Sequence, residues 1–221
     1  MPEIRTLFGE TLIELSGFLL EATPALVERF DSPSSLAKFS VRGLAGHLLR
    51  AMTSLDGYLD APDPAASGQR GAREVVSAAA YYAAILGNET DIDSDLHRSV
   101  RRRGVEAAPG RPDDFAVEWG ETAGALVVRL EREPPDRLVE VYGGLVLTLD
   151  EYLVTRLIEL VVHGDDLAAS LGETPPPVSP AATGLVIATL VDVARLRHGD
   201  TAVVQALARR ERDAVGALRV I

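Results

Sequence analysis

The chain has no cysteine among its 221 residues. This absence excludes disulfide bonds, zinc sites built on thiolates, and nucleophilic or redox chemistry by a protein thiol. Any thiol chemistry on this protein would therefore need a sulfur atom brought by a small molecule.

Long apolar runs and an excess of positive charge are also missing. No apolar run approaches the roughly 20 residues of a membrane-spanning helix, and the N-terminal MPEIRTLFGE carries charges where a signal peptide needs an apolar centre. Lysine and arginine total 22 against 33 aspartates and glutamates, so the net charge of -11 repels nucleic-acid phosphates and anionic membranes. We expect a cytoplasmic protein that binds neither nucleic acid nor membranes.

The pattern that is present is mainly helical. Apolar residues recur every three or four positions from Glu3 to Leu20, which predicts a first helix, with a break or restart at Pro24. Ser40 is a suitable cap for a second helix. The apolar stripe of this second helix consists of Val41, Leu44, Leu48, Met52, Leu55 and Leu59. The proline- and glycine-rich residues 60–71 then form a loop.

The middle of the chain has less definite boundaries. Residues 72–86, 91–104 and 111–133 are each compatible with a helix. In residues 134–149, PPDRLVEVYGGLVLTL, two β-branched runs flank Gly143-Gly144, which predicts a β-hairpin with a two-residue turn.

A further long helix follows the hairpin. We expect Asp150 to cap it, Leu171 to end it and Gly172 to stop it. After the extended TPPPVSP come two more helices, separated by Gly199-Asp200 acting as stop and cap. The sequence therefore predicts a mainly α fold with one small hairpin and a short helical C-terminal extension.

One edge of the helix after the hairpin carries a line of functional groups. At about 100° per residue, Tyr152, Arg156, Glu159, His163 and Asp166 fall within an arc of roughly 80°. The arc beside it holds the apolar residues Leu153, Leu157, Leu160, Leu167, Ala168 and Leu171. The polar line thus borders the buried stripe.

Two interpretations fit Glu159 and His163. They form either an exposed ion pair worth a few tenths of a kcal/mol, with Arg156 pairing with Glu159 and Asp166 solvated, or two ligands of one cation. A carboxylate and an imidazole suit zinc, iron or nickel better than calcium or magnesium.

A metal site would need a third ligand from elsewhere in the chain. His198 lies at a predicted helix end, where a cationic side chain has a structural role, and His97 has four arginines nearby, which disfavours a divalent cation. His47 lies between Leu44 and Leu48, at the margin of an apolar face. It is either an ordinary core histidine or the best available third ligand.

Two segments together resemble a known family. SVRGLAGHLLRAM (40–52) and, after the hairpin, RLIELVVHGDDLAASLG (156–172) look like the mycothiol-dependent maleylpyruvate isomerase family, within the DinB-like group of four-helix-bundle metalloproteins. The resemblance covers residues 1–172. It implies a DinB-like up-down four-helix bundle with the hairpin before the fourth core helix, and residues 173–221 as a proline linker and helical extension packed on the bundle.

The resemblance also implies a metal site. In that family a divalent metal, typically zinc, is held by a histidine of the second helix and by a glutamate and a histidine of the fourth, and these positions match His47, Glu159 and His163. Three protein ligands with an open position resemble catalytic rather than structural zinc. The family further implies mycothiol, the low-molecular-weight thiol of actinobacteria, whose thiol pKa the metal would lower.

Roles for the neighbouring residues follow as hypotheses. Asp166 would accept the free N-H of His163 or His47, while Asp165 points into solvent. Arg156 and Tyr152 would contact an anionic substrate or a thiol carboxylate at the rim, with an ion pair between Arg156 and a glutamate as the structural alternative.

The chain departs from the family in one respect. Fuller members have a separate α/β domain after the bundle that contributes to the active site, whereas only residues 181–221 follow TPPPVSP here. We therefore expect a relative that consists of the bundle and its extension, with a reaction that the sequence leaves unassigned.

Three functions remain open from the sequence. The leading one is a metal-dependent thiol transferase or isomerase acting on a small electrophile with mycothiol. The alternatives are a non-catalytic metal-binding or regulatory bundle, and a scaffold that forms a homodimer through its C-terminal helices.

Overall fold

A computed structural model describes residues 3–65, 74–87, 91–212 and 214–220. Its longer helices are α1 (Ile4–Arg29), α2 (Val41–Asp60), α4 (Asp95–Ala107), α5 (Phe115–Leu130), α6 (Leu149–Leu171) and α7 (Pro180–His198). Three short helices are α3 (Ala78–Leu86), α8 (Asp200–Ala208) and α9 (Ala214–Leu218), and the strands are β1 (Leu138–Glu140) and β2 (Val146–Thr148). The prediction of a mainly α chain with one hairpin is confirmed. Within the described ranges, no helix combines the length and apolar character needed to cross a membrane.

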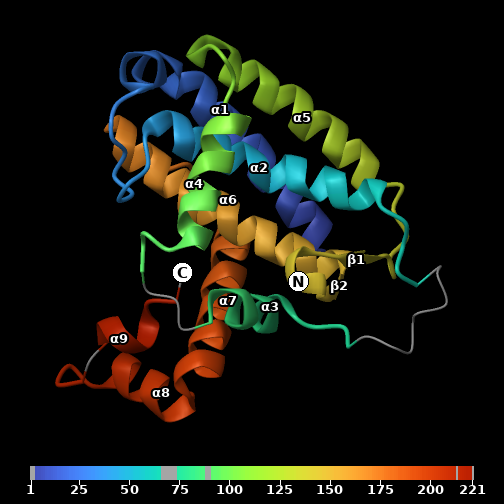
Figure 1. Ribbon diagram of the computed structural model, residues 1–221, viewed down its shortest axis with the longest axis vertical. Coiled ribbons are helices and arrows are strands. Elements are labelled where there is room, and N and C mark those ends of the chain that lie inside the picture. The colour runs from blue at the N-terminus through green and yellow to red at the C-terminus, as the bar shows by residue number, and fades with distance from the viewer. Residues whose placement is uncertain (1–2, 66–73, 88–90, 213, 221) are drawn as a thin grey trace.

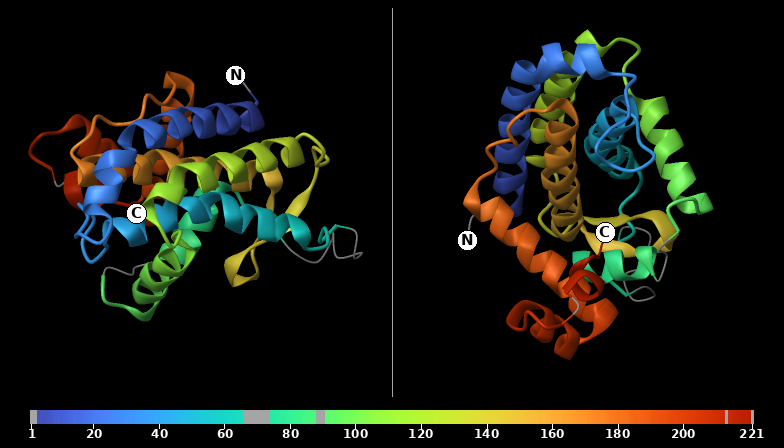
Figure 2. Two further views of the ribbon diagram at one scale, coloured as in Figure 1. Left: turned by 90° about the horizontal axis from the view of Figure 1, so that it is seen from above. Right: turned by 90° about the vertical axis from the view of Figure 1, so that its left-hand side faces the viewer.

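Helices α1, α2, α5 and α6 pack around a common core (Figures 1 and 2). α6 contacts both α1 and α2, and α5 contacts the same two helices. The largest fully buried side chains of this core are Trp119, Tyr152, Phe8, Phe115, Leu12, Leu15, Leu19, Leu26, Leu44, Leu48, Leu49 and Met52. α4 crosses α2, and α3 and α7 contact α6, so three further helices surround the α2–α6 pair.

The expected helix caps, stops and breaks can be compared with the observed helix ends. The Ser40 hydroxyl accepts a hydrogen bond from the Gly43 amide at 3.1 Å, which confirms Ser40 as the cap of α2. Gly172 has φ 76° and ends α6 as predicted. The expected break at Pro24 is wrong, because α1 continues through it to Arg29. Proline removes one backbone hydrogen bond, and the burial of the following Leu26 against the core keeps the helix intact.

The cap of α6 is also different from the expected one. The Thr148 side chain accepts a hydrogen bond from the Glu151 amide at 3.1 Å, so α6 begins at Leu149 and Asp150 lies in its first turn. At the start of α8, Gly199 stops the preceding helix, but Asp200 makes no capping bond. Its carboxylate pairs with Arg195 at 2.7 Å instead.

The hairpin pairs Leu138 with Thr148 and Glu140 with Val146 in antiparallel register. Its turn is longer than the predicted two residues, because Val141 donates its amide to the Leu145 carbonyl at 2.9 Å and residues 142–144 form the connection. Both glycines there have positive φ, 83° and 72°, which explains the glycine pair.

The segment that was expected to be helical from residue 72 is partly extended. Residues 72–73 lie outside the described part. Val75 forms a bridge with Val146, and the Val76 amide donates to the Val146 carbonyl at 2.9 Å, so the helix starts only at Ala78. Val75 and Val76 therefore lie beside β2 and lead directly into α3.

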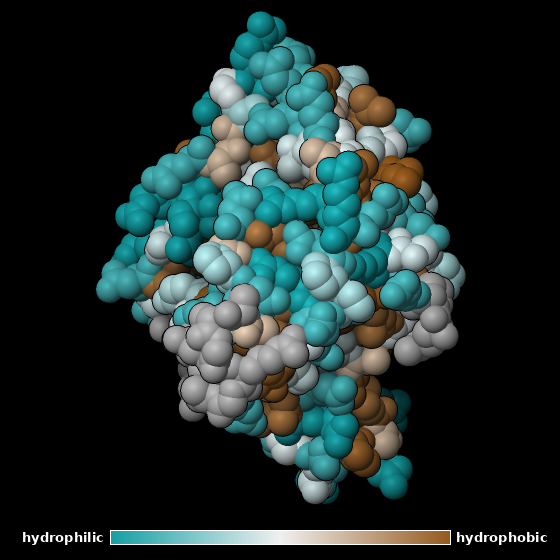
Figure 3. Space-filling model, turned by 90° about the vertical axis from the view of Figure 1, so that its right-hand side faces the viewer, coloured by the Kyte–Doolittle hydropathy of each residue, from teal (hydrophilic) through white to brown (hydrophobic). Residues whose placement is uncertain are grey.

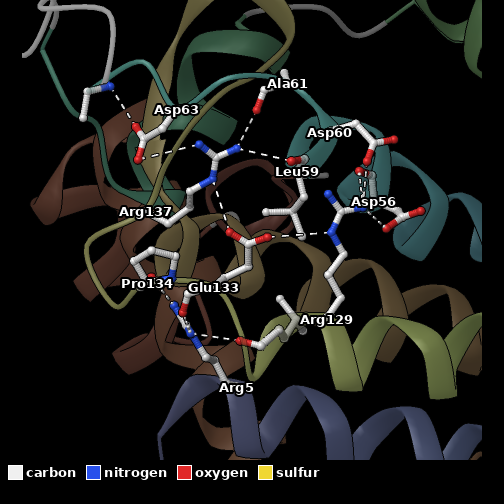
Figure 4. A network of polar contacts seen from close by, with 12 residues as sticks. Arg5, Asp56, Leu59, Asp60, Ala61, Asp63, Arg129, Glu133, Pro134 and Arg137 are labelled. Atoms are coloured by element: carbon white, nitrogen blue, oxygen red, sulfur yellow. Dashed lines mark hydrogen bonds and ion pairs between the residues drawn. The ribbon is translucent and has the colours of Figure 1, made fainter.

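An arginine network holds the hairpin end of the molecule together (Figure 4). Arg137 is buried and donates to the carbonyl oxygens of Leu59 and Ala61 at the end of α2. Glu133 joins this residue to Arg129, and Arg5 donates to three carbonyl groups near the end of α5. These contacts join α1 to the ends of α2 and α5, and Arg5 also pairs with Asp150 in the first turn of α6 at 3.1 Å.

Candidate metal centre

Small residues set the position of His47. Gly43 and Gly46 of α2 face Gly104 of α4, and the contact is so close that a Cβ atom added at Gly46 would overlap the Gly104 carbonyl oxygen. A Cβ atom at Gly104 would lie 3.3 Å from the Cβ of His47. His47 lies directly beside this close contact, and its ring faces Glu159 and His163 of α6.

The structure brings His47, Glu159 and His163 together. One ligand atom from each side chain lies within 4.8 Å of the others. Nε2 of His47 is 3.2 Å from Oε2 of Glu159, and Nε2 of His163 is 3.3 Å from the same oxygen. The two imidazole rings meet edge to face, with centroids 4.7 Å apart. The three groups are partly buried, with 18% of each side chain exposed.

Asp166 lies behind His163. Its Oδ2 is 2.9 Å from Nδ1 of His163, so the carboxylate accepts the Nδ1 hydrogen and leaves Nε2 facing Glu159. This is the arrangement by which a carboxylate fixes the tautomer and orientation of a ligating histidine. The sequence offered His163 or His47 as the hydrogen-bond partner of Asp166, and the structure shows this hydrogen bond with His163. The neighbouring Asp165 is exposed.

The charges of the site are strongly coupled. Burial alone would raise the pKa of Glu159, but hydrogen bonds from His163 and His47 and the charge of Arg156 hold that pKa well below its usual range. Burial lowers the pKa of His163, while hydrogen bonds with Asp166 and Glu159 outweigh this effect and raise it to about 9 without a metal ion. Glu159 is therefore a carboxylate at neutral pH.

Arg156 and Tyr152 lie next to the triad on α6. The guanidinium group of Arg156 stacks over the Tyr152 ring, 4.8 Å from its centroid, and its Nη2 is 3.9 Å from Glu159. Its Nε donates to the Thr155 hydroxyl at 3.1 Å. The ion pair expected as the structural alternative for Arg156 is thus present at long range. Tyr152 is 2% exposed and lies beneath the guanidinium group.

The two remaining histidines lie away from this cluster. Nδ1 of His97 is 2.7 Å from the Asp91 carbonyl oxygen, and His198 is exposed at the end of α7. Among the residues that the structure describes, His47, Glu159 and His163 form the one group of three or more histidines and carboxylates placed to hold a metal ion.

Tyr82 of α3, which the sequence does not single out, also contacts the triad. Its hydroxyl is 2.7 Å from Oε1 of Glu159 and 3.1 Å from the Thr155 carbonyl oxygen. Burial and the nearby Glu159 raise the pKa of Tyr82 well above its usual value, so its hydroxyl stays protonated and donates. A tyrosine in AAAYYAAIL gives no periodic signal that it faces α6. Only the packing of α3 against α6 brings it there.

We expect the change Tyr82→Phe to weaken divalent-metal binding by about 10- to 100-fold, the usual effect of losing an outer partner of a ligand. Without the hydroxyl donor, Oε1 of Glu159 loses the bond that orients its carboxylate. Tyr81→Phe is the matched control, because Tyr81 is also buried but makes no hydrogen bond with Glu159. Zinc titration against a chromogenic chelator measures both. Equal affinities in the two variants would contradict the assigned role.

The donor set fits a divalent metal. Two imidazoles and one carboxylate are the ligands of many catalytic zinc sites, and the three side chains here converge from two helices with one histidine already oriented by a carboxylate. His47 has no such second partner, since its Nδ1 is buried without a hydrogen bond among the described residues. The residues therefore provide three ligands, one fewer than the four protein ligands of a typical structural zinc site.

Comparison with known proteins gives one match. Residues 16–168 match the family model of the mycothiol maleylpyruvate isomerase N-terminal domain. No curated protein and no solved structure matches the chain. The matched region includes all three residues of the triad, and it covers more than half of the chain. The chain therefore belongs to the mycothiol maleylpyruvate isomerase N-terminal domain family.

Proposed function

We propose that this protein is a metal-dependent enzyme that uses mycothiol, as a thiol transferase or in a thiol-assisted isomerisation of a small electrophile. The convergence of His47, Glu159 and His163 within 4.8 Å is the observation that carries the proposal. The family match supports mycothiol as the thiol. We propose zinc as the metal, because two imidazoles and a carboxylate are typical zinc ligands.

The chain's own residues have defined tasks in this proposal. Asp166 holds the Nδ1 hydrogen of His163, and Tyr82 holds one oxygen of Glu159, so the opposite atoms of both ligands point to a common centre. A bound metal would lower the pKa of the mycothiol thiol so that a thiolate exists near neutral pH. Since the protein has no cysteine, no side chain competes as a thiolate at the site.

Arg156 completes the proposed site. Its charge is buried beside Glu159 and above Tyr152, where it offers donors to an anionic group of the substrate. We propose it as the binding residue for such a group. Tyr152 supports the guanidinium group through the face of its ring. A direct contact of Tyr152 with the substrate would require its buried hydroxyl to become accessible.

Mycothiol is expected to bind through its sulfur. Added to cobalt-substituted protein, it should change the visible absorption spectrum, because thiolate ligation adds an intense charge-transfer band. The matched control is S-methylated mycothiol, which has the same sugar and inositol groups but no ionisable thiol, and it should leave the spectrum unchanged. If mycothiol also has no effect on folded, cobalt-loaded protein, the non-catalytic metal-binding alternative is the better description.

We also propose a finer description of the fold and its setting. Residues 1–172 would form a DinB-like up-down four-helix bundle, followed by a proline linker and helical extension in residues 173–221, in a cytoplasmic protein. The contacts of α7 with α1, α3 and α6 support an extension that packs on the bundle. The end of the family match at residue 168 supports the boundary.

The C-terminal helices support the proposal of a homodimer. Figure 3 shows hydrophilic side chains over most of the face it draws and hydrophobic ones scattered among them, some at the narrow lower end, where α7 and α8 lie in Figure 1. The exposed aliphatic residues of the C-terminal helices are Ile187, Leu196, Val204, Leu207 and Val215. Exposed apolar surface of this kind favours association between copies.

A further inference from the structure

Helix α1 has a second apolar row on the side away from the core. Exposed apolar or small residues recur there at alternating spacings of four and three, namely Ile13, Gly17, Leu20, Pro24 and Val27. At about 100° per residue they fall within an arc of roughly 80°. Ile13 and Leu20 are 71% and 63% exposed. This spacing is typical of a helix face that packs against another helix.

Helix α5 is the neighbour of α1 along this row. The two helices lie side by side in both views of Figure 2. The Trp119 indole donates to the Ser16 hydroxyl at 3.1 Å, and a Cβ atom added at Gly9 would lie 3.7 Å from Val127. Positions that rise in number along α1 thus meet positions that fall along α5. The two helices are therefore antiparallel, and their outer surfaces adjoin over several turns.

The outer side of α5 also carries exposed apolar and small residues. Val117 is 59% exposed, and Gly120 and Gly124 are exposed as well. The antiparallel alignment places Leu20 at the level of Val117 and Gly17 at the level of Gly120. We call the combined surface the α1–α5 face, which consists of Ile13, Gly17, Leu20, Val117, Gly120 and Gly124.

The glycines of the α1–α5 face leave room for another backbone. A Cβ atom added at Gly17, Gly120 or Gly124 would meet no atom within 4 Å, in contrast to the tight contact at Gly46. Glycine weakens the interior of a helix relative to alanine, and it permits close approach of a partner. Because no contact within the chain uses the space at these three positions, an incoming helix can approach α1 and α5 closely.

The surroundings of the α1–α5 face are uniformly acidic. The glutamates of the two helices in this region are Glu10, Glu14, Glu21, Glu28, Glu118 and Glu121. Residues 10–28 of α1 and 115–128 of α5 include neither lysine nor arginine. Within the described part of the chain, none of these glutamates forms an ion pair. The apolar face is therefore bordered by negative charge that no basic side chain of the same helices offsets.

This charge distinguishes a second copy of the chain from a different partner. In a symmetric antiparallel pair of α1 helices, Glu14, Glu21 and Glu28 of each copy would flank one apolar seam, and facing like charges are destabilising. The net charge of -11 adds to the repulsion between copies. A partner with lysine or arginine beside its own apolar row instead meets opposite charge. The face thus fits a basic helix better than a second copy.

We propose that the α1–α5 face binds an amphipathic helix of another protein, in which apolar residues recur every three or four positions and are flanked by lysine or arginine. The row from Ile13 to Val27 spans about 21 Å, so a partner helix of about four turns covers it. The inference is independent of the proposed function, because the face includes no residue of the triad.

A synthetic peptide of three heptads is the probe for this face, with leucine at positions a and d and lysine at positions e and g. The fluorescence anisotropy of a dye-labelled peptide should rise when the full chain is added. One control peptide has glutamate in place of lysine, and another has the same composition in scrambled order; neither should bind. Equal binding of the scrambled peptide would show general attraction of cations to an acidic protein and would overturn the site. Absence of binding by the lysine peptide would overturn it as well.

Ile13→Gln combined with Leu20→Gln should weaken binding of the lysine peptide by about tenfold or more, because two apolar contacts are lost. The matched control is Ile187→Gln combined with Leu196→Gln on α7, where the residues are 57% and 60% exposed. It should leave binding within about twofold of the wild type. All four positions are exposed, and circular dichroism verifies that both variants fold. Equal weakening by the two variants, or unchanged binding to the α1 variant, would contradict the proposal.

Charge reversal tests the basic character of the partner. Glu21→Lys combined with Glu121→Lys should weaken binding of the lysine peptide and strengthen binding of the glutamate peptide, each by about tenfold. An unchanged preference for lysine would overturn the charge argument.

Analytical ultracentrifugation tests the alternative of a second copy. Ile13→Gln combined with Leu20→Gln should leave the molecular mass in solution equal to that of the wild type. Conversion of a dimer into a monomer by this variant would show that the α1–α5 face joins two copies, and the proposal of a basic partner would then be wrong.

Discussion

Glu159→Gln should reduce the zinc content of the purified protein from about one atom per chain to a small fraction of this value. Glutamine keeps the shape of the side chain and an oxygen for the Tyr82 hydroxyl, but it removes the negative charge that faces both histidines at 3.2 and 3.3 Å. Loss of a ligand should exceed the roughly 10- to 100-fold effect of losing an outer partner. His163→Ala should have a comparable effect. Elemental analysis of dialysed protein measures both.

His198→Ala is the control for these variants. His198 is exposed at the end of α7 and lies outside the triad, so its removal should leave the zinc content unchanged. Circular dichroism and the unfolding midpoint establish that each variant folds. Full zinc content in both folded Glu159→Gln and folded His163→Ala would refute the metal site and, with it, the proposed thiol chemistry.

Gly46→Ala should lower the free energy of unfolding by about 3 kcal/mol or more. The added methyl group would overlap the Gly104 carbonyl oxygen and approach the backbone of Ala108 at 2.6 Å, so α2 and α4 would have to separate. Overpacking usually lowers stability by about 1 to 3 kcal/mol, and rigid backbone on the other side gives little room for relaxation. Because His47 is the next residue, zinc affinity should fall as well. Urea unfolding with and without zinc measures both effects.

Gly57→Ala on the same helix provides the contrast. A Cβ atom there would meet nothing within 4 Å, and the residue is exposed. Alanine is the better helix former by about 0.5 to 1 kcal/mol, so this variant should be slightly more stable than the wild type. A Gly46→Ala protein as stable as Gly57→Ala would mean that the close contact between α2 and α4 is absent in solution.

Local chemistry explains which parts of the fold could be predicted. The Ser40 cap, the stop at Gly172 and the apolar stripe of α2 depend on residues a few positions apart, and all three are present. The errors have a different origin. α1 continues through Pro24 because its far end is buried against the core, and Thr148, the last residue of β2, caps α6 in place of Asp150.

The same distinction between local spacing and tertiary packing applies to the residues of the candidate metal site. Spacing alone placed Glu159, His163 and Asp166 on one side of a single helix, since residues three and four apart share a face. Tyr82 was not identified, because it lies on α3, whose sequence carries no periodic signal for the direction of one side chain. Its contribution depends on where this short helix packs.

The sequence by itself determined that no protein thiol takes part and that a carboxylate and an imidazole project together from one helix. Both facts follow from residue identity and from the fixed geometry of a helix. Only the tertiary structure decided that His47 meets this pair and that Tyr82 orients Glu159. These contacts join helices that are distant in the sequence. Their geometry is set by core packing and by the close approach of Gly43 and Gly46 to Gly104, which no local pattern specifies.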